Sequence, residues 1–133
     1  MTISDRGHLL DTHTFLWMTS APDRLGPEAR AVIEDPAARL VLSVASVWEM
    51  AIKRSLGKLE LPAPLPSFLK RQLHATRTSL LDIRAEHALE VDDLPWHHRD
   101  PFDRLLVAQA RFEGLIVHSR DTAFDGYEFP RTW

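Results

Sequence analysis

Short apolar runs alternate with longer amphipathic segments along the chain, and this pattern predicts strands separated by helices. The runs that indicate buried strands lie at Leu9–Leu10, 39–43, 79–83 and 115–119. The strongest helical segment between them covers 100–114. Strands separated by helices of about ten or more residues are typical of parallel pairing with helices on both faces. We therefore expect an α/β fold with a parallel twisted sheet of about four to five strands.

Residues at the ends of the helical segments support these boundaries. Asp100 and Pro101 are typical of a helix start, and Gly114 is typical of its end. Ser43 is expected to cap the helix after the second strand, which Gly57 ends. In that helix, helical spacing predicts one apolar stripe, formed by Val44, Val47, Trp48, Ala51 and Ile52. Further helices are expected after Asp11, from Pro27, through Leu69 and Leu73, and over 85–94.

Composition restricts the class of protein. A length of 133 residues predicts a single domain, 1–133, and contents of 44% apolar and 26% charged residues are typical of a folded globular protein. The absence of cysteine excludes disulfides, thiolate zinc sites and cysteine nucleophiles, and favours a reducing cytoplasm. No apolar stretch approaches the ~20 residues that cross a membrane. The segment "MTISDRGH" lacks the apolar core of a signal peptide. A net charge of −3 gives no overall basic field for a nucleic acid.

Four carboxylates are expected at one edge of the predicted sheet. Asp11 ends the first strand, and Asp121 follows the last clear strand. Glu49 lies in the second turn of one helix and Asp103 in the first turn of another. Ligands in such folds bind beyond the carboxyl ends of the strands. Clustered carboxylates repel one another unless a cation joins them, and oxygen ligands suit Mg²⁺ or Mn²⁺. Such a metal places a water molecule and stabilises charge on a phosphodiester.

Each of these acids also has a purely structural interpretation. Asp11 is a possible helix cap, and Glu49 is a possible partner of Lys53 four residues later. Asp103 follows Asp100 by three residues, but we assign the capping role mainly to Asp100 and let Asp103 point into the cleft. Asp121 and Asp125 both fit an ordinary turn. The joint placement of the acids therefore carries more weight than any one of them.

The histidines are less informative. "WHHRD" (96–100) resembles a metal-binding segment, but adjacent side chains do not share a face, so we interpret His97 and His98 as loop residues. His13 lies close to the expected site and is a candidate for contact with a substrate. His118, within a strand, is expected to be a buried or edge residue with its polar atoms satisfied.

Four segments together resemble a known family. They are "LLDTHTFLW" (9–17), "SVASVWEMAIK" (43–53), "DPFDRLLVAQA" (100–110) and "SRDTAFDGY" (119–127). They resemble the PIN-domain ribonucleases, specifically the VapC-type toxins of bacterial toxin–antitoxin pairs, and "DPFDRLLVAQA" is the most specific of them. The resemblance implies a PIN fold and cleavage of RNA with Mg²⁺, or alternatively Mn²⁺. It also implies inhibition by a cognate VapB-like antitoxin and a homodimer.

The resemblance also implies roles for individual residues. By position, the family's four acids correspond to Asp11, Glu49, Asp103 and Asp121, which would serve as catalytic and metal-binding residues. Ser119 stands where the family often places a small hydroxyl residue. We expect Thr12 to steady Asp11 or to bind the water shell of the ion, and we count Thr12, His13 and Ser119 as substrate-binding candidates. Whether Asp121 or Asp125 completes the site, and whether one or two ions bind, stays open.

Two other functions use the same features. A structure-specific DNA nuclease or phosphoesterase would share the fold and the acidic cluster, so only a panel of substrates separates it from a ribonuclease. A non-catalytic RNA-binding or antitoxin-binding module is a different class, but clustered negative charge facing phosphates does not favour it. The segments "TFLW" (14–17) and "VWEMAIK" (47–53) are expected to present an apolar groove for an antitoxin segment, unless Phe15, Leu16 and Trp17 simply fill the core.

Overall fold

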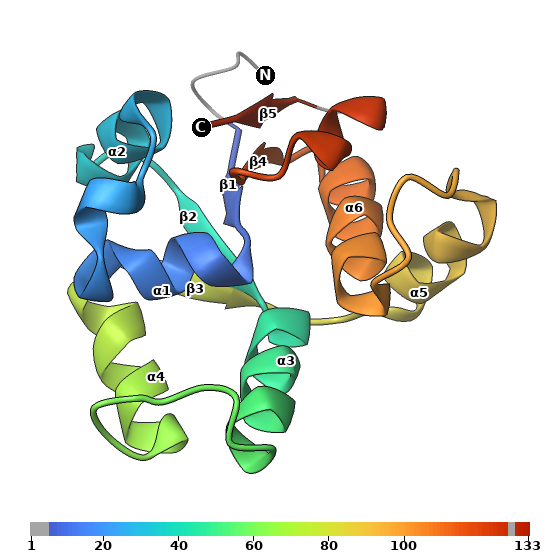
Figure 1. Cartoon of the computed structure of the whole chain (residues 1–133). Coiled ribbons are helices and arrows are strands. Elements are labelled where there is room, and N and C mark those ends of the chain that lie inside the picture. Colours follow the sequence, from blue (N-terminus) through green and yellow to red (C-terminus); the bar gives the residue numbers. More distant parts are fainter. Residues whose placement is uncertain (1–5, 128–129) are drawn as a thin grey trace.

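A five-stranded parallel sheet lies at the centre of the computed structural model, which describes residues 6–127 and 130–133 (Figure 1). The strands are β1 His8–Leu10, β2 Leu40–Ser43, β3 Thr78–Leu81, β4 Ile116–His118 and β5 Arg131–Thr132, in the spatial order β3-β2-β1-β4-β5. Every neighbouring pair is parallel, so all carboxyl ends meet at one edge. The expected parallel α/β sheet is therefore confirmed, and β5 is an addition that the hydrophobic pattern did not predict.

The helices occupy the segments that the sequence predicted. They are α1 Thr12–Ser20, α2 Pro27–Glu34, α3 Val44–Ser55, α4 Leu65–Ala75, α5 Ala85–Glu90 and α6 Pro101–Glu113. Short 3₁₀ turns lie at η2 Pro22–Arg24, η3 Val91–Asp93 and η4 Thr122–Gly126. No helix in the described part of the chain is long and apolar enough to span a membrane. Most of the N-terminal segment searched for a signal peptide (1–5) lies outside the described residues.

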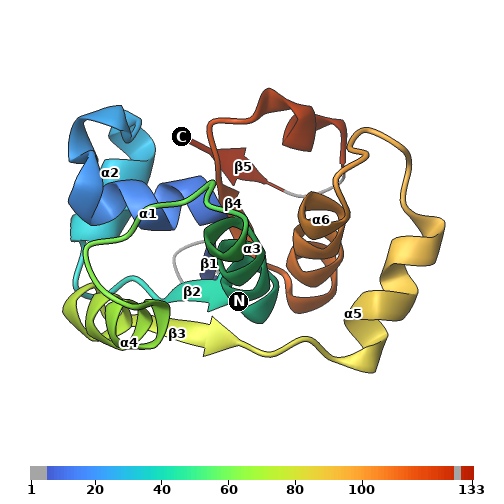
Figure 2. The same cartoon turned by 60° about the horizontal axis from the view of Figure 1, so that its bottom comes forward.

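The sheet separates two hydrophobic layers. On one face, Leu9, Val41 and Val117 pack against Leu106 and Ala110 of α6. On the other face, residues of β1 and β2 pack with α1, α2, α3 and α4 around the fully buried Phe15. Figures 1 and 2 show α1, α2 and α4 on one side of the sheet and α5 and α6 on the other. The expected arrangement with helices on both faces is confirmed.

Helix α3 is rotated relative to the stripe that its spacing predicted. Ser43 caps it as expected, accepting a hydrogen bond from the backbone N–H of Ala45. The stripe itself is not the buried face, because Trp48 is 57% exposed. The buried residues of α3 are Ala45, Ser46, Glu49 and Met50. The helix therefore turns a carboxylate inward, toward the carboxyl edge of the sheet.

Candidate metal centre at the carboxyl edge of the sheet

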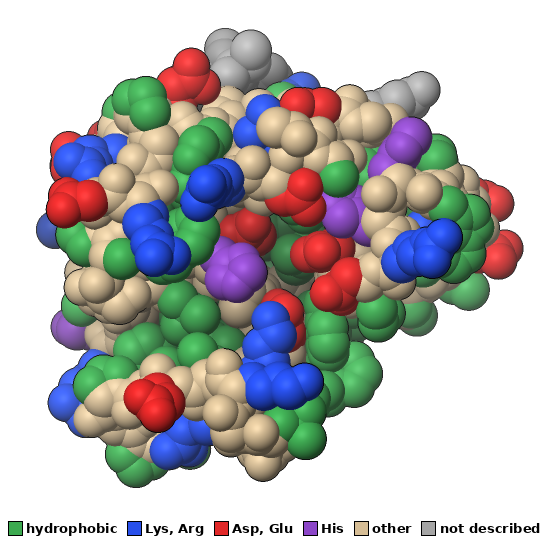
Figure 3. Space-filling model, in the orientation of Figure 1, with side chains coloured by type: hydrophobic (Ala, Val, Ile, Leu, Met, Phe, Trp, Pro, Cys, Tyr) green, Lys and Arg blue, Asp and Glu red, His purple; other side chains and the backbone are tan. Residues whose placement is uncertain are grey.

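A small cavity of about 160 Å³ opens at the carboxyl edge of the sheet. All four predicted carboxylates line it, although they come from four separate segments of the chain. Among the described residues, the lining consists of Asp11, Thr12, His13, Glu49, Lys53, Asp100, Asp103, Asp121 and Phe124. Figure 3 shows acidic side chains gathered near the middle of this face. The fold thus brings together the residues that the sequence placed at strand and helix ends.

Asp11 both caps α1 and faces the cavity. It follows β1 directly, and its Oδ1 accepts hydrogen bonds from the Thr14 backbone N–H (2.9 Å) and the Thr14 hydroxyl (2.6 Å). Its Oδ2 accepts a hydrogen bond from the Ser119 hydroxyl, across from the end of β4. Both interpretations of Asp11 are therefore compatible, because the donors that make it a cap also fix its carboxylate at the cavity wall.

Glu49 is held by two neighbours at once. Its Oε1 accepts a hydrogen bond of 2.6 Å from the Thr12 hydroxyl, and its Oε2 lies 2.8 Å from Lys53 Nζ. The predicted i, i+4 ion pair therefore exists, yet Glu49 is only 9% exposed and still lines the cavity. Thr12 steadies Glu49 rather than Asp11, so the expected contact of Thr12 with Asp11 was wrong. The alternative, that Thr12 binds the water shell of an ion, stays a prediction. The cause is the inward rotation of α3, which the stripe of apolar residues did not predict.

Asp103 differs from the first two acids. It lies in the first turn of α6, where Asp100 supplies the cap by accepting a hydrogen bond from the Phe102 N–H. Within the described residues, no donor or cation contacts the Asp103 carboxylate. Burial raises the pKa of Asp103 to about 7, and the negative charges of its neighbours add to the shift. These neighbours are Asp100, Glu49, Asp11 and Asp121.

Asp121 and Asp125 occupy different environments after β4. Asp121 caps η4, with Oδ1 accepting a hydrogen bond from the Ala123 N–H, and it lines the cavity. Asp125 instead forms an exposed two-point ion pair with Arg131, at 2.7 and 3.1 Å, which lowers the pKa of Asp125. The geometry therefore places Asp121 at the cavity and Asp125 away from its lining.

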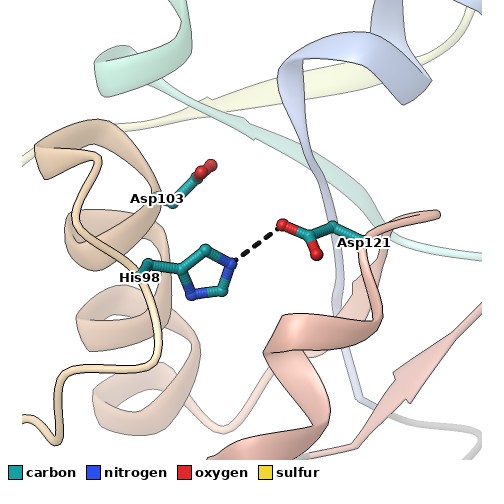
Figure 4. Close-up of side chains that lie close together, drawn as sticks. All are labelled: His98, Asp103 and Asp121. Atoms are coloured by element: carbon teal, nitrogen blue, oxygen red, sulfur yellow. Dashed lines mark hydrogen bonds and ion pairs between the residues drawn. The ribbon is translucent and has the colours of Figure 1, made fainter.

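His98 is the neighbour of the acids that sequence reasoning missed. It lies in the loop before α6, as expected, but its side chain is buried and its Nε2 lies 3.0 Å from Asp121 Oδ2 (Figure 4). One potential ligand atom from each of His98, Asp103 and Asp121 lies within 4.8 Å of the others. Adjacent histidines do not share one ion, but His98 reaches the acids without His97. The only available signal was its position two residues before Asp100.

The remaining predicted residues surround the acids. His13 is exposed at the cavity and stacks on Trp17, whereas Ser119 is buried and also accepts a hydrogen bond from the Asp121 N–H. His118 is buried and bonds to His8 Nδ1 (2.8 Å) and Thr132 Oγ1 (2.7 Å), as expected of a satisfied strand residue. Burial and then His8 lower the pKa of His118 to about 4, so its ring is neutral at pH 7.

The donor set fits a hard divalent cation. Of the residues that the structure describes, five carboxylates line the cavity, and Lys53 is the one lysine or arginine beside them. Burial and, after it, the neighbouring acids raise the pKa of Asp103, so its ionised form is disfavoured in the metal-free protein. Carboxylate oxygens around a polar cavity are the ligands preferred by Mg²⁺ and Mn²⁺. The residues present are therefore suited to bind such an ion.

Comparison with known proteins agrees with this fold. The PIN domain family matches residues 8–130. Over 124 residues, the chain is 30% identical to Ribonuclease VapC22 of Mycobacterium tuberculosis, covering 92% of this chain and 93% of that protein. It is 38% identical to Ribonuclease VapC16 of the same organism over 60 residues, a local match of 45% of this chain and 43% of that protein.

A solved structure extends the comparison to three dimensions. The crystal structure of DNA-bound VapBC from Salmonella typhimurium contains a chain that matches with a TM-score of 0.69. The match covers 96% of this chain and 97% of that chain, at 15% sequence identity, and so it concerns the fold. The family match over residues 8–130, nearly the whole sequence, shows that the chain belongs to the PIN-domain family.

Proposed function

We propose that this protein is a metal-dependent endoribonuclease and the toxin of a type II toxin–antitoxin pair. The observation that carries the proposal is the convergence of four carboxylates from separate segments on one cavity, in a PIN-domain chain. The relatives named as ribonucleases and the similar chain from a VapBC complex support the same activity and the same kind of partner.

The cavity residues divide into those that hold a metal ion and those that position the ligands. We assign the ion to Asp11, Glu49, Asp103 and Asp121. When bound, a divalent ion supplies a water of lowered pKa and stabilises charge on the phosphodiester. Thr12 and Ser119 position the Glu49 and Asp11 carboxylates, since each hydroxyl donates a hydrogen bond to one of them. His13, exposed at the cavity, remains the candidate for direct contact with RNA.

An apolar hollow beside the acids is the proposed antitoxin site. It measures about 590 Å³ and includes Leu16, Trp17, Leu61 and Phe68 in its lining, and His13 borders both the hollow and the acidic cavity. Figure 3 shows hydrophobic side chains in a hollow next to the acidic centre. The predicted groove is corrected in two respects: Phe15 is fully buried in the core, and α3 does not line this hollow. Amide exchange should therefore show protection by the cognate antitoxin at 13–20 and 59–68.

The expected homodimer stays a prediction, and α3 offers a surface for it. Trp48 is 57% and Leu56 62% exposed, and Trp48 contacts the ring of Phe102 edge-on. Such an exposed apolar surface is typical of a protein interface. We expect Trp48→Asp to shift the protein toward a monomer in light scattering, and an unchanged mass would argue against this surface.

The ribonuclease proposal is tested by incubating the purified protein with total RNA and mapping the cut ends. We expect cleavage with Mg²⁺ or Mn²⁺ and none in excess chelator, with Asp103→Asn as the inactive control. Single-stranded and duplex DNA in the same panel test the alternative nuclease. Undiminished cleavage in chelator, or cleavage of DNA alone, would overturn the proposal.

A further inference from the structure

We propose that His98 is a positioning residue of the metal centre, which orients the Asp121 carboxylate while Tyr127 holds the imidazole from the other side. This inference rests on the proposed function, because it concerns the same cavity. It assigns a role to one histidine of the "WHHRD" segment, which sequence reasoning treated as an ordinary loop.

The His98 ring has little freedom to rotate. The residue is 7% exposed, and its ring lies nearly parallel to the Tyr127 ring, with centroids 5.6 Å apart. The ring of Phe124 also packs against the imidazole, with the two ring centroids 4.4 Å apart. Two aromatic neighbours from the segment after β4 thus enclose an imidazole that belongs to the loop before α6.

Both ring nitrogens of His98 are engaged. Nε2 lies 3.0 Å from Asp121 Oδ2, and Nδ1 lies 3.2 Å from the Tyr127 hydroxyl oxygen, which also accepts a hydrogen bond from the His98 backbone N–H. An ionised carboxylate only accepts hydrogen bonds, so Nε2 carries the proton. The imidazole therefore points a donor at Asp121 instead of a free lone pair at the cavity, which favours positioning over direct ligation of a metal.

The backbone of the loop is also fixed. Arg104 of α6 is 5% exposed, and its guanidinium donates hydrogen bonds to four backbone carbonyls of the segment that precedes α6. These carbonyls belong to Val91, Leu94, Pro95 and His98. A buried arginine that is satisfied by carbonyls stabilises one loop conformation. The loop therefore presents His98 at a defined place beside the acids.

Asp121 is the carboxylate that most needs such support. Its side chain is 47% exposed and sits on the short connection after β4. Oδ1 accepts from the Ala123 N–H, and the His98 imidazole holds Oδ2, so both oxygens have a defined direction (Figure 4). Hydrogen bonds of this kind to ligating groups commonly change metal affinity by about 10- to 100-fold.

Two substitutions test the roles of the two ring nitrogens of His98 separately. In His98→Gln the side-chain amide can reach the position of Nε2 and keep a donor toward Asp121, whereas in His98→Asn the shorter amide stays near Nδ1 and Tyr127. We would measure Mn²⁺ affinity of the metal-free full chain by calorimetry. We expect Mn²⁺ binding to be about 10- to 100-fold weaker for His98→Asn and close to wild type for His98→Gln. In an Asp121→Asn background, the two variants should bind Mn²⁺ equally.

The adjacent histidine supplies the matched control. His97 is exposed, its ring meets the Tyr127 ring edge-on with centroids 4.8 Å apart, and among the described residues it forms no hydrogen bond with the acids. His97→Asn should therefore bind Mn²⁺ like the wild type. Pulsed electron paramagnetic resonance of the Mn²⁺ complex should show no directly coupled imidazole nitrogen. A coupled nitrogen, or equal affinities of His98→Asn and the wild type, would overturn the positioning role. A wild type that binds no Mn²⁺ would instead contradict the proposed metal centre itself.

Discussion

The two sides of the acidic cavity are built differently. On one side, Asp11 and Glu49 each accept hydrogen bonds from hydroxyl groups, and Glu49 also pairs with Lys53. On the other side, Asp103 has no such donor among the described residues, and burial with four neighbouring acids raises its pKa to about 7. The carboxylates of the first side are held by donors within the protein, whereas burial and the neighbouring acids disfavour the ionised form of Asp103.

This difference indicates how the cavity would respond to a cation. The anchored acids have fixed orientations before any ion arrives, which reduces the reorganisation on binding. The Asp103 carboxylate is repelled by its acidic neighbours and has no compensating donor among the described residues. A bound divalent ion should therefore stabilise the ionised form of Asp103 more than that of the anchored acids. Removal of the charge at Asp103 should therefore stabilise the metal-free protein, whereas removal of the hydrogen-bond donors to Asp11 or Glu49 should destabilise it.

The largest effect is expected for Asp103→Asn. RNA cleavage should fall by about 100-fold or more, because the ion loses a ligand and the attacking water loses its placement. The metal-free variant should unfold at an equal or higher temperature than the wild type, since one like charge is gone. Mg²⁺ should raise its melting temperature less than that of the wild type. Thermal melts with Mg²⁺ and with chelator measure the two effects on melting temperature, and an RNA cleavage assay measures the rate.

A capping role for Asp103 predicts the opposite signs. The variant would then lose up to about 1 kcal/mol through the helix dipole, with its metal response intact. Because Asp100 already caps α6, that cap stays intact in Asp103→Asn. The capping role would hold if metal-free Asp103→Asn melts at a lower temperature than the wild type, is stabilised as much by Mg²⁺ and still cuts RNA. Asp103 would then stabilise the start of α6 without binding a metal ion.

On the anchored side, Ser119→Ala is expected to have the next largest effect. The variant removes the donor to Asp11 Oδ2 and the acceptor for the Asp121 N–H. We expect a loss of about 1–3 kcal/mol in the free energy of unfolding, because buried polar groups lose their partners. Mn²⁺ affinity should also fall by about 10-fold. Urea unfolding and calorimetry measure the two effects, and Ser55→Ala at the exposed end of α3 is the control.

The pH dependence of stability tests the Asp103 side of the cavity in the metal-free wild type. A carboxyl whose pKa rises from 3.8 to about 7 on folding keeps a proton that the unfolded chain has lost. Between these values the folded state binds more protons, so the stability that Asp103 contributes falls as pH rises. The metal-free wild type should therefore lose stability relative to Asp103→Asn between pH 5 and pH 8. A constant difference across this range of urea unfolding curves would contradict the raised pKa.

The smallest effect is expected for Lys53→Met. The Lys53–Glu49 pair is an i, i+4 ion pair with a 40% exposed lysine side chain, and such pairs contribute about 0.3–0.5 kcal/mol. Chemical unfolding should therefore change very little, whereas RNA affinity is the more sensitive measurement if Lys53 also meets a phosphate. A stability loss several times larger would mean that Lys53, rather than Thr12, holds Glu49 in place.

Much of the fold follows from local sequence patterns. Aliphatic runs predicted β1 to β4, and Pro27, Ser43, Asp100 and Gly114 marked helix ends that the structure confirms. Two features depended on tertiary packing. β5 has only two residues and carries no pattern, and α3 buries Glu49 while it exposes Trp48. Periodicity identifies an apolar stripe but does not state which face packs against the sheet.

The site was predictable only in part for the same reason. Asp11 and Asp121 follow strand ends, so the parallel topology alone brings them to one edge. The partner of Thr12 and the reach of His98 depend on contacts between segments distant in sequence, such as the bond of His98 with Asp121. A sequence pattern indicates which residues lie at an edge, whereas their mutual hydrogen bonds follow from packing.

Titration of the metal-free protein with Mg²⁺, by calorimetry at pH 6.5 in two buffers of different ionisation enthalpy, tests the central claim most directly. Because Asp103 has a pKa of about 7, binding of Mg²⁺ should displace its proton, and the measured heat should depend on the buffer. We predict binding with proton release for the wild type, and weaker binding with little release for Asp103→Asn. No binding, or binding with the same heat in both buffers and both proteins, would contradict a metal centre that includes Asp103.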